Sequence, residues 1–227
     1  MRIGVLGTGM VGQTLSAKLA ELGHDVMVGT RDVAALLART EPGMGQTEPF
    51  SAWSRAHPAI RLGTFAEAAA HGTTMFNATS GTVSLVVLEQ AGAANLDGKT
   101  LVDVANPLDF SRGMPPTLTV SNTDSVGEQL QRAFPGLKVV KSLNTVTAAL
   151  MVNPRLLADG DHTMFVCGND AAAKAHVTTM LTDWFGWRDV VDLGDISSAR
   201  GMEMYLPLWL RLWGALGTPM LNVQVMR

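Results

Sequence analysis

The 227-residue sequence lacks several features that define common classes of protein. It has one cysteine, Cys167, which excludes an intramolecular disulfide and any metal site built from several cysteines. A small buried side chain is the favoured interpretation of this cysteine. Seventeen basic residues against 20 acidic ones give a net charge of −3. A general nucleic-acid-binding protein normally has a basic excess, so its absence argues against nucleic acid as a partner.

Long apolar runs are missing as well. The most apolar stretch, Met204–Met226, is interrupted by Pro207, Arg211 and Pro219, so it falls short of the ~18 apolar residues of a membrane-spanning helix. The first residues enter a strand-like stretch with no apolar signal region or cleavage site. Because charged residues make up only 16% and hydrophobic residues 47%, disorder is excluded. We expect a cytoplasmic protein that has no membrane segment.

Recognisable groups of catalytic side chains are also absent. The five histidines show no metal-ligand spacing, and neither a Gly-x-Ser-x-Gly motif nor a nucleophile–base pair occurs. Lys141 and Lys174 are the remaining candidates for a general acid, but Lys141 lies within a predicted strand and Lys174 on a polar helix face. We therefore predict no catalytic side chain and no metal.

Short apolar runs alternate regularly with amphipathic stretches. Repeated strand–helix–strand units of this kind imply a parallel sheet covered on both faces, which is the α/β, doubly wound Rossmann class. Strands are expected at residues 3–6, 25–29, 60–62, 74–78, 100–104, 138–143, 163–167 and 189–193. Helices are expected at about 11–22, 33–39, 65–70, 83–91, 125–134, 171–184 and 199–216.

Two loops rich in proline and glycine interrupt the alternation, at residues 41–58 and 106–122. The first one carries Phe50 and Trp53, which indicates that it packs down onto the body of the protein. We divide the chain into a Rossmann domain, 1–145, and a small C-terminal α/β domain, 146–227, that closes the cleft.

The strongest motif is a G-x-G-x-x-G sequence that follows the first strand and opens a helix. Gly7 allows the tight turn, Gly9 lets the backbone approach a pyrophosphate, and Gly12 lets the helix and strand pack closely. The helix N-terminus attracts the anion. The predicted dinucleotide-binding residues at this loop are Gly7, Thr8, Gly9, Met10, Val11 and Gly12.

The end of the second strand indicates which dinucleotide is bound. An acidic residue there would bind the ribose 2′-hydroxyl of NAD, but this strand ends in Thr30 and Arg31. A hydroxyl and a guanidinium suit a 2′-phosphate through charge-assisted hydrogen bonds. A solvated surface arginine is the alternative. Asp32 would favour NAD if it pointed at the ribose instead of Thr30. We predict NADP(H).

Small polar residues follow three further strands, at the edge where ligands bind in open parallel sheets. Each segment alone is also typical of a turn or a helix cap. Together they suit a flat nicotinamide and a second flat ring. Ala78, Thr79, Ser80, Asn106 and Pro107 are the predicted cofactor-binding residues there, and Asn144 and Thr145 are assigned to the substrate pocket.

The C-terminal run from Tyr205 to Trp213 is crowded with large apolar side chains. It is interpreted either as core or dimer interface, or as a hydrophobic roof over a flat acceptor ring. Leu206 is its candidate pocket residue. A homodimer is expected from this apolar region.

With these motifs in view, the chain resembles the NADP oxidoreductases that use the deazaflavin coenzyme F420. The resemblance covers nearly the whole length and includes Gly7–Gly12, Gly29–Asp32, Asp103–Pro107, Val140–Thr145 and Asp192–Asp195. It implies a Rossmann domain and a small C-terminal domain with two rings face to face between them, Thr30 and Arg31 on the 2′-phosphate, and Thr79 and Ser80 near the nicotinamide. The cytosolic domain of membrane metalloreductases is similar too.

The chain departs from the family pattern in three places. The 41–58 loop is longer, no lysine follows Arg31 closely, and the segment after Ser80 lacks a small-apolar-proline run. We predict an NADP(H)-dependent oxidoreductase that transfers hydride between nicotinamide and a small-molecule acceptor, with coenzyme F420 favoured. Reduction of a flavin or of a small carbonyl or imine is the alternative, and so is an NADPH-sensing module without turnover.

Overall fold

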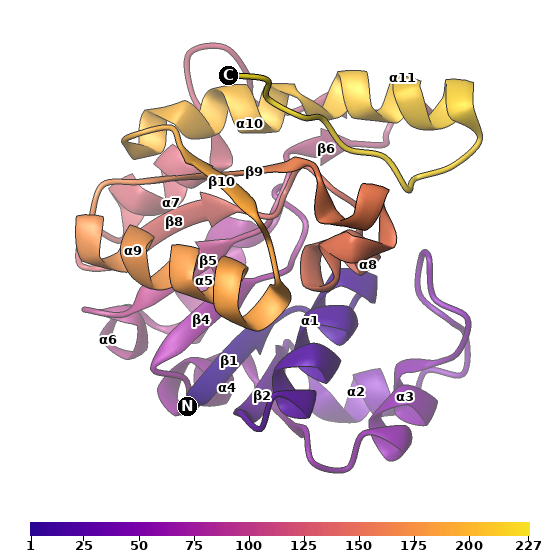
Figure 1. Ribbon diagram of the computed structural model, residues 1–227. Helices are drawn as coiled ribbons and strands as arrows, with labels where there is room; N and C mark the ends of the chain where they lie inside the picture. The colour runs from indigo at the N-terminus through magenta and orange to yellow at the C-terminus, as the bar shows by residue number, and fades with distance from the viewer.

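The computed structural model describes residues 1–227 and contains one eight-stranded sheet with helices on both faces (Figure 1). The strand order is β10-β9-β8-β5-β4-β1-β2-β3. In this order, β8 and all the strands that follow it run parallel to one another. This order confirms the predicted doubly wound class. The strands are β1 (Arg2–Leu6), β2 (Asp25–Thr30), β3 (Arg61–Thr64), β4 (Thr74–Asn77), β5 (Thr100–Asp103), β8 (Lys138–Ser142), β9 (Thr163–Gly168) and β10 (Asp189–Asp192).

The sheet separates two hydrophobic cores because successive side chains of a strand point to opposite faces. In β1, Val5 belongs to one core and Leu6 to the other; in β4, Phe76 and Met75 divide in the same way. The first core is covered by α1 (Met10–Glu21), α2 (Val33–Leu37), α3 (Phe50–Ala56), α8 (Ala148–Val152) and α9 (Ala171–Thr179). The second is covered by α4 (Phe65–His71), α5 (Ser84–Ala91), α6 (Ala93–Leu96), α7 (Val126–Ala133) and α10 (Ala199–Met204).

The last two strands depart from the predicted parallel arrangement. β9 pairs antiparallel with β8, with Ser142 opposite Val166, and β10 runs parallel to β9. The direction reverses because residues 143–162 stay at the carboxyl end of β8, where α8 packs against α1, instead of crossing over the sheet. β9 and β10 therefore extend the same sheet beyond the predicted boundary after residue 145. The division into two domains stays a prediction.

Several segments are more helical than predicted. The 41–58 segment, expected to be a loop, contains α3, whose Phe50 and Trp53 are buried in the first core, as expected from their apolar side chains. The helices α6 and α8 were not predicted. Past Thr179, the predicted 171–184 helix continues as a π-helical segment, Met180–Phe185.

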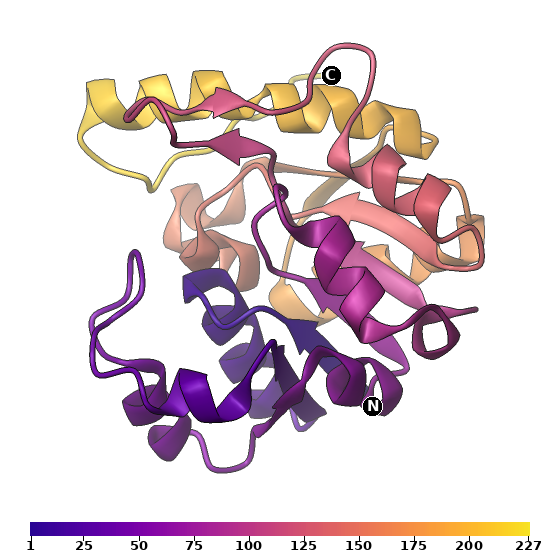
Figure 2. The ribbon, with the colours of Figure 1, turned by 180° about the vertical axis from the view of Figure 1, so that it is seen from behind.

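The C-terminal region covers the carboxyl end of the central strands (Figure 2). The helix α11 (Leu206–Leu216) lies beside a short hairpin, β6 (Leu108–Asp109) and β7 (Thr117–Leu118), which occupies part of the predicted 106–122 loop. Leu206, Trp209, Leu210 and Leu221 form a small third core against which Leu108 packs. After α11 the chain returns to β9, where the Thr163 amide donates to the Val223 carbonyl. None of the helices has both the length and the hydropathy that a membrane span requires.

Candidate dinucleotide and acceptor site

The loops after β1 and β4 meet at the point where the strand order reverses. Chain connections diverge from here to opposite ends of the sheet, which leaves a crevice at the carboxyl ends of the strands. The Gly7 amide donates to the Gly29 carbonyl at 3.1 Å, which joins the first loop to the end of β2. A dinucleotide at this place would extend toward β2 on one side and toward β5 on the other.

The glycines of the first loop meet the requirements of a pyrophosphate site. Gly7 has a φ of +118°, and a Cβ there would lie 2.6 Å from the Ala78 carbonyl oxygen. A Cβ on Gly12 would lie 2.1 Å from the Gly7 carbonyl oxygen. Gly9, in contrast, has nothing within 4 Å of a Cβ position, and no side chain caps the start of α1. The open space in front of this helix N-terminus therefore fits an anionic pyrophosphate.

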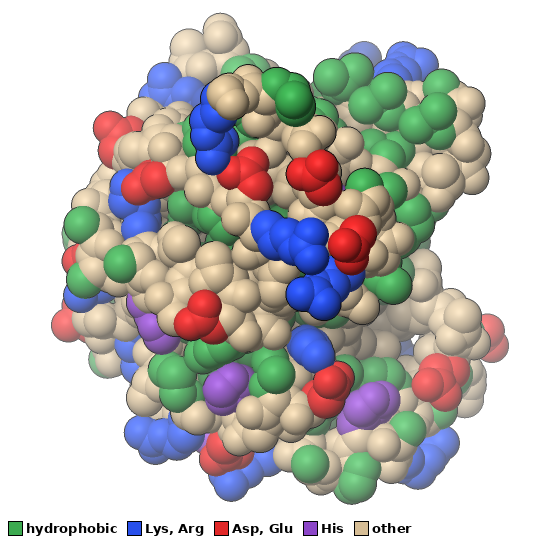
Figure 3. All heavy atoms as spheres, viewed as in Figure 1, with side chains coloured by type: hydrophobic (Ala, Val, Ile, Leu, Met, Phe, Trp, Pro, Cys, Tyr) green, Lys and Arg blue, Asp and Glu red, His purple; other side chains and the backbone are tan.

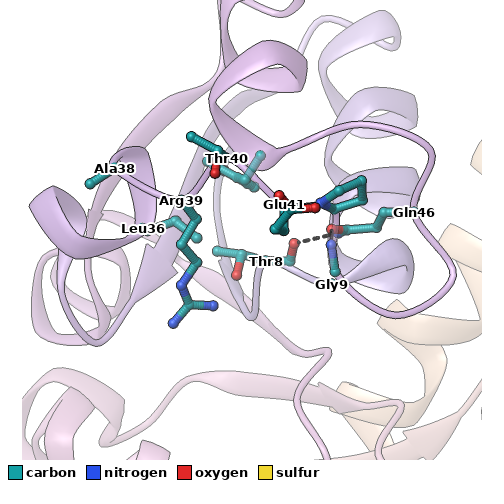
Figure 4. A pocket seen from close by; sticks show the side chains of 11 residues that line it. Thr8, Gly9, Leu36, Ala38, Arg39, Thr40, Glu41 and Gln46 are labelled. Carbon is teal, nitrogen blue, oxygen red and sulfur yellow. Dashed lines mark hydrogen bonds between the residues drawn. The ribbon is translucent and has the colours of Figure 1, made fainter.

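A cavity of about 520 Å³ lies on the β2 side of the glycine loop (Figure 4). The Thr8 carbonyl at its floor accepts hydrogen bonds from Gln46 Nε2 at 2.9 Å and from Gln13 Nε2 at 3.0 Å. The Gln46 bond fastens the segment between α2 and α3 to the glycine loop, and the Gln13 bond joins the loop to α1. The lining residues are Thr8, Gly9, Leu36, Ala38, Arg39, Thr40, Glu41, Pro42, Gly43, Gln46 and Phe50.

The residues after β2 match the chemistry of a 2′-phosphate. Thr30 is buried at the end of the strand, whereas Arg31 is exposed and forms no ion pair. The Asp32 carboxylate accepts a hydrogen bond from the Ala35 amide at 2.9 Å and caps α2. Asp32 is thus engaged by its own helix, which favours the interpretation in which Thr30 and Arg31 face the ribose.

Arg39 is a cationic residue that sequence reasoning missed. Its side chain reaches into the cavity beside Thr8 and forms no ion pair (Figure 4). The sequence search covered only the residues directly after Arg31, whereas Arg39 follows the short helix α2. Basic residues at the far end of that helix were the signal that could have found it.

A second cavity, of about 220 Å³, lies on the β4–β5 side of the same loop. It brings together five residues of the predicted site, from the first turn of α1 and from the loops after β4 and β5. Its lining residues are Val11, Ala78, Thr79, Ser80, Val104, Ala105, Asn106, Leu108 and Phe110. Two predicted neighbours lie elsewhere: Met10 lines a separate cavity below residues 45–48, and Pro107 is buried with its carbonyl accepting from the Thr119 amide.

The residues predicted for the substrate pocket lie behind this second cavity. Asn144 and Thr145 are each 1% exposed. Asn144 Nδ2 donates to Asn106 Oδ1 at 2.9 Å, and Asn106 Nδ2 donates back to the Asn144 carbonyl. Leu206 is buried in the third core, which packs against Leu108. Asn144 and Leu206 therefore support residues of the cavity wall.

Lys141, Lys174 and Cys167 are each held in an ion pair or buried. Burial alone would lower the pKa of Lys141, but the Asp103 and Glu203 carboxylates more than offset this and the pKa is raised. Lys174, at the surface, pairs with Asp192 at 2.8 Å. Burial raises the pKa of the Cys167 thiol to about 12. None of these groups lines the second cavity, whose wall contains no titratable side chain.

Comparison with known proteins identifies the family to which this site belongs. Residues 2–107 match the family described as NADP oxidoreductase, coenzyme F420-dependent. A crystal structure of a candidate F420-dependent NADP reductase from Arthrobacter sp. FB24 is 57% identical over the full length of both chains, with a TM-score of 0.95. The chain belongs to the F420-dependent NADP oxidoreductase family. It is thereby assigned to the NADP-dependent oxidoreductases.

Two curated relatives extend the comparison. The F420-dependent NADP reductase of Methanothermobacter marburgensis is 24% identical over 216 residues, covering 93% of this chain and 92% of that one. The metalloreductase STEAP3 of Rattus norvegicus is 29% identical over 213 residues. This alignment covers 92% of the present chain but only 38% of STEAP3. The family resemblance predicted from the motifs is confirmed.

Proposed function

We propose that this F420-dependent NADP oxidoreductase family member transfers hydride between NADP(H) and a flat acceptor, with the deazaflavin coenzyme F420 as the favoured acceptor. The observation that carries the proposal is the pair of cavities on either side of the glycine loop. The larger one, with Arg39, suits the adenosine half of the dinucleotide, and the smaller one suits the nicotinamide. The hairpin residues Leu108 and Phe110 add an apolar wall on which a second ring can stack.

The walls of the smaller cavity act by placing rings and excluding water. When bound, NADPH supplies a hydride from nicotinamide C4, and the acceptor takes up the hydride together with a proton. Because no titratable side chain lines this cavity, solvent supplies that proton. Thr79, Ser80 and Asn106 offer hydroxyl and amide groups that can orient the nicotinamide carboxamide. Alignment of the two rings is therefore the protein's main contribution to the reaction.

Acceptor identity is tested by mixing the purified protein with NADPH and one acceptor at a time: F420, FMN, FAD, and a panel of small carbonyls and imines. Absorbance at the NADPH and F420 bands follows both substrates. We expect NADPH oxidation that depends on F420, with one equivalent of F420 reduced per NADPH. Faster NADPH oxidation with a flavin, a carbonyl or an imine would show that this compound, and not F420, is the acceptor. Tight NADPH binding without turnover on the whole panel would support a sensor.

The preference for NADP(H) over NAD(H) is tested by Arg31→Ala. Loss of a charge-assisted hydrogen bond to a phosphate corresponds to roughly 1.5–3 kcal/mol, so NADPH affinity should fall about 10-fold or more. NADH lacks the 2′-phosphate and its affinity should change little. Titration calorimetry with both dinucleotides measures the two effects. An equal loss for both would contradict the assignment of Arg31, and no binding of either would contradict the proposed function.

We further propose that the protein is a cytoplasmic homodimer that associates through α11. This helix exposes Leu208 (55%) and Leu216 (62%), and Figure 3 shows hydrophobic side chains gathered over the lobe that carries it. Burial of such side chains between two copies would stabilise a dimer. Sedimentation as a monomer at micromolar concentration would contradict the dimer, and recovery outside the cytosolic fraction of the source cells would contradict the location.

A further inference from the structure

A buried charged cluster lies directly behind the smaller cavity. Lys141 on β8 is completely buried, as is Asp103 on β5, and Glu203 on α10 is 1% exposed. Lys141 Nζ lies 2.8 Å from Asp103 Oδ2 and 2.8 Å from Glu203 Oε1, and it also donates to the Ala105 carbonyl. These three acceptors occupy all the hydrogens of the ammonium group. The cluster touches no solvent, so it has no role in binding a surface ligand.

One arm of the cluster leads to the cavity wall. Asp103 Oδ1 accepts a hydrogen bond from Asn77 Nδ2 at 2.8 Å. Asn77 Oδ1 in turn accepts from Thr79 Oγ1 at 2.6 Å and from the Thr79 amide at 3.3 Å. The loop after β4, which we assign to the nicotinamide, is thus held from below by an unbroken chain of side-chain hydrogen bonds that ends at Lys141.

The other arm leads to the C-terminal helices. Glu203 Oε2 accepts from the Val126 amide at 2.9 Å and Oε1 from the Gly127 amide at 3.2 Å, at the start of α7. The carbonyl of Met202, the preceding residue, accepts from Asn144 Nδ2, which also holds Asn106 in the cavity wall. Three residues after Glu203, Leu206 belongs to the third core, against which Leu108 packs. The position of the apolar side of the cavity therefore depends on Glu203.

A buried group of three charges is a weak stabilising device, because desolvation offsets most of the Coulomb attraction. Its hydrogen bonds are directional, however, and fix the geometry of the segments that carry them. Here those segments are the nicotinamide loop on one side and the helix behind the apolar wall on the other. The cluster joins the two surfaces between which, on the proposed function, the two rings must stack.

We propose that Lys141 is a positioning residue for hydride transfer: through Asp103 and Glu203 it fixes the distance between the nicotinamide loop, residues 78–82, and the C-terminal helices, residues 199–216. The proposal rests on the proposed function but concerns a separate property. Lys141 itself contacts neither ring. Misplacement of reacting atoms by about 1 Å lowers a rate by about 100-fold, so a small shift of one surface has a large kinetic effect.

The test compares Glu203→Gln with Glu128→Gln as the matched control. Glu128 is also a buried carboxylate at the start of α7, and it binds Arg200 Nε on α10 at 2.9 Å. Both substitutions thus weaken the attachment of α10 to α7 with an isosteric amide. Only Glu203 contacts Lys141, so only Glu203→Gln should disturb the nicotinamide loop.

Hydrogen–deuterium exchange with and without NADPH provides the first readout. For Glu203→Gln we expect faster exchange in residues 78–82 and 199–206 together, whereas Glu128→Gln should affect only α7 and α10. Faster exchange in α10 alone, or the same exchange pattern in both variants, would overturn the proposal. This readout needs no turnover, so it tests the link between Glu203 and the nicotinamide loop separately from the proposed function.

Kinetics with 4-deuterated NADPH provides the second readout. Glu203→Gln should lower kcat about 10-fold or more and raise the primary isotope effect, because a longer transfer distance makes hydride transfer slower than product release. The Kd for NADPH should stay within about twofold, since the glycine loop and the larger cavity are untouched. Loss of activity in proportion to the loss of folded protein, with an unchanged isotope effect, would show a purely structural role and overturn the proposal.

Discussion

The two sides of the glycine loop are built in different ways. The β2 side is made by segments close in sequence, residues 7–12 and 30–46, and its cations Arg31 and Arg39 are exposed. The β5 side depends on side chains far apart in the chain: Lys141 is 38 residues from Asp103, and Val126 is 77 from Glu203. Binding a charged dinucleotide needs only a local motif and accessible cations. On the proposed function, two rings must be held in register, and this needs rigid segments, which the long-range buried hydrogen bonds around Lys141 provide.

The largest effect is expected from removing the central charge of the buried cluster formed by Lys141, Asp103 and Glu203. Lys141→Met leaves two carboxylates buried without their counter-ion, which should lower the free energy of unfolding by about 3–5 kcal/mol. On the β2 side, Lys18→Met removes only an exposed pair with Glu21, and the loss should be below about 1 kcal/mol. Urea denaturation followed by circular dichroism measures both.

Raising the pH gives an independent check of the same cluster. The raised pKa of Lys141 means that its contribution to stability is complete below about pH 10.5, its ordinary value, and is lost only as the pH rises through the higher folded-state pKa. The gap between the parent and Lys141→Met should therefore persist across neutral and mildly alkaline pH. A gap that closes below pH 10 would contradict a charged lysine.

The β2 side should show the opposite pattern, in which binding changes and stability does not. A methyl group on Gly9 meets nothing within 4 Å, and its φ of −74° suits alanine. Gly9→Ala should therefore keep the parent stability. The same methyl group would occupy the space in which the pyrophosphate approaches the backbone, so NADPH affinity should fall about 10-fold or more.

Fluorescence titration with NADPH measures this loss, and Gly214→Ala on α11 is the control, because its Cβ position is equally open but far along the chain from the loop. Unchanged NADPH affinity in Gly9→Ala would show that the glycine loop is not part of the dinucleotide site. A large loss of stability would show that the open space at Gly9 is required for folding.

The contrast between the two sides explains what could be predicted from the sequence. The strands from β1 to β5 and β8, and the G-x-G-x-x-G loop, were recognisable because their signals are local: hydrophobic periodicity and glycine spacing. The reversed direction of β9 was not, because a strand's partner and direction depend on the path of residues 143–162 and leave no mark in the strand itself. The short α6 and α8 escaped detection because so few residues show little periodicity.

The same distinction applies to the site. The structure brings Thr79 and Asn106 together at one cavity, beside Val11 of α1, because strand ends of a parallel sheet share an edge. Their role in binding stays a prediction. Lys141 was considered as a general acid and interpreted as a strand lysine. Its buried partners were missed, since a single basic residue carries no information about the two carboxylates, 38 residues before it and 62 after it. Asn144 was assigned to the pocket, whereas its side chain holds Asn106 from behind.

A smaller effect is expected at Arg39, which would sharpen the description of the β2 side. An exposed cation near a phosphate contributes a screened attraction, so Arg39→Ala should weaken NADPH binding about 3- to 10-fold and leave NADH unchanged. The loss should shrink as salt is added. Arg55→Ala, on α3 and outside the cavity, is the control. An equal change for both dinucleotides would mean that Arg39 faces the adenine ring and not the phosphate.

The smallest effect on stability is expected for an ion pair that lies on the β5 side but is exposed. It tests whether burial, rather than location on that side, makes a charged pair important for stability. Asp124 and Arg132 lie on the β5 side, but at the surface. Hydrogen bonds from Arg132 lower the pKa of Asp124 from 3.8 to about 2, so this pair stabilises the fold above about pH 4 and its contribution is lost as the pH falls toward 2. Solvent screening limits that contribution to about 1 kcal/mol. Acid titration of stability should show this loss in the parent and not in Asp124→Asn. If location mattered more than burial, Asp124→Asn would instead destabilise the protein at pH 7 as much as Lys141→Met. That result would show that loss of any charge on the β5 side, buried or not, lowers the free energy of unfolding.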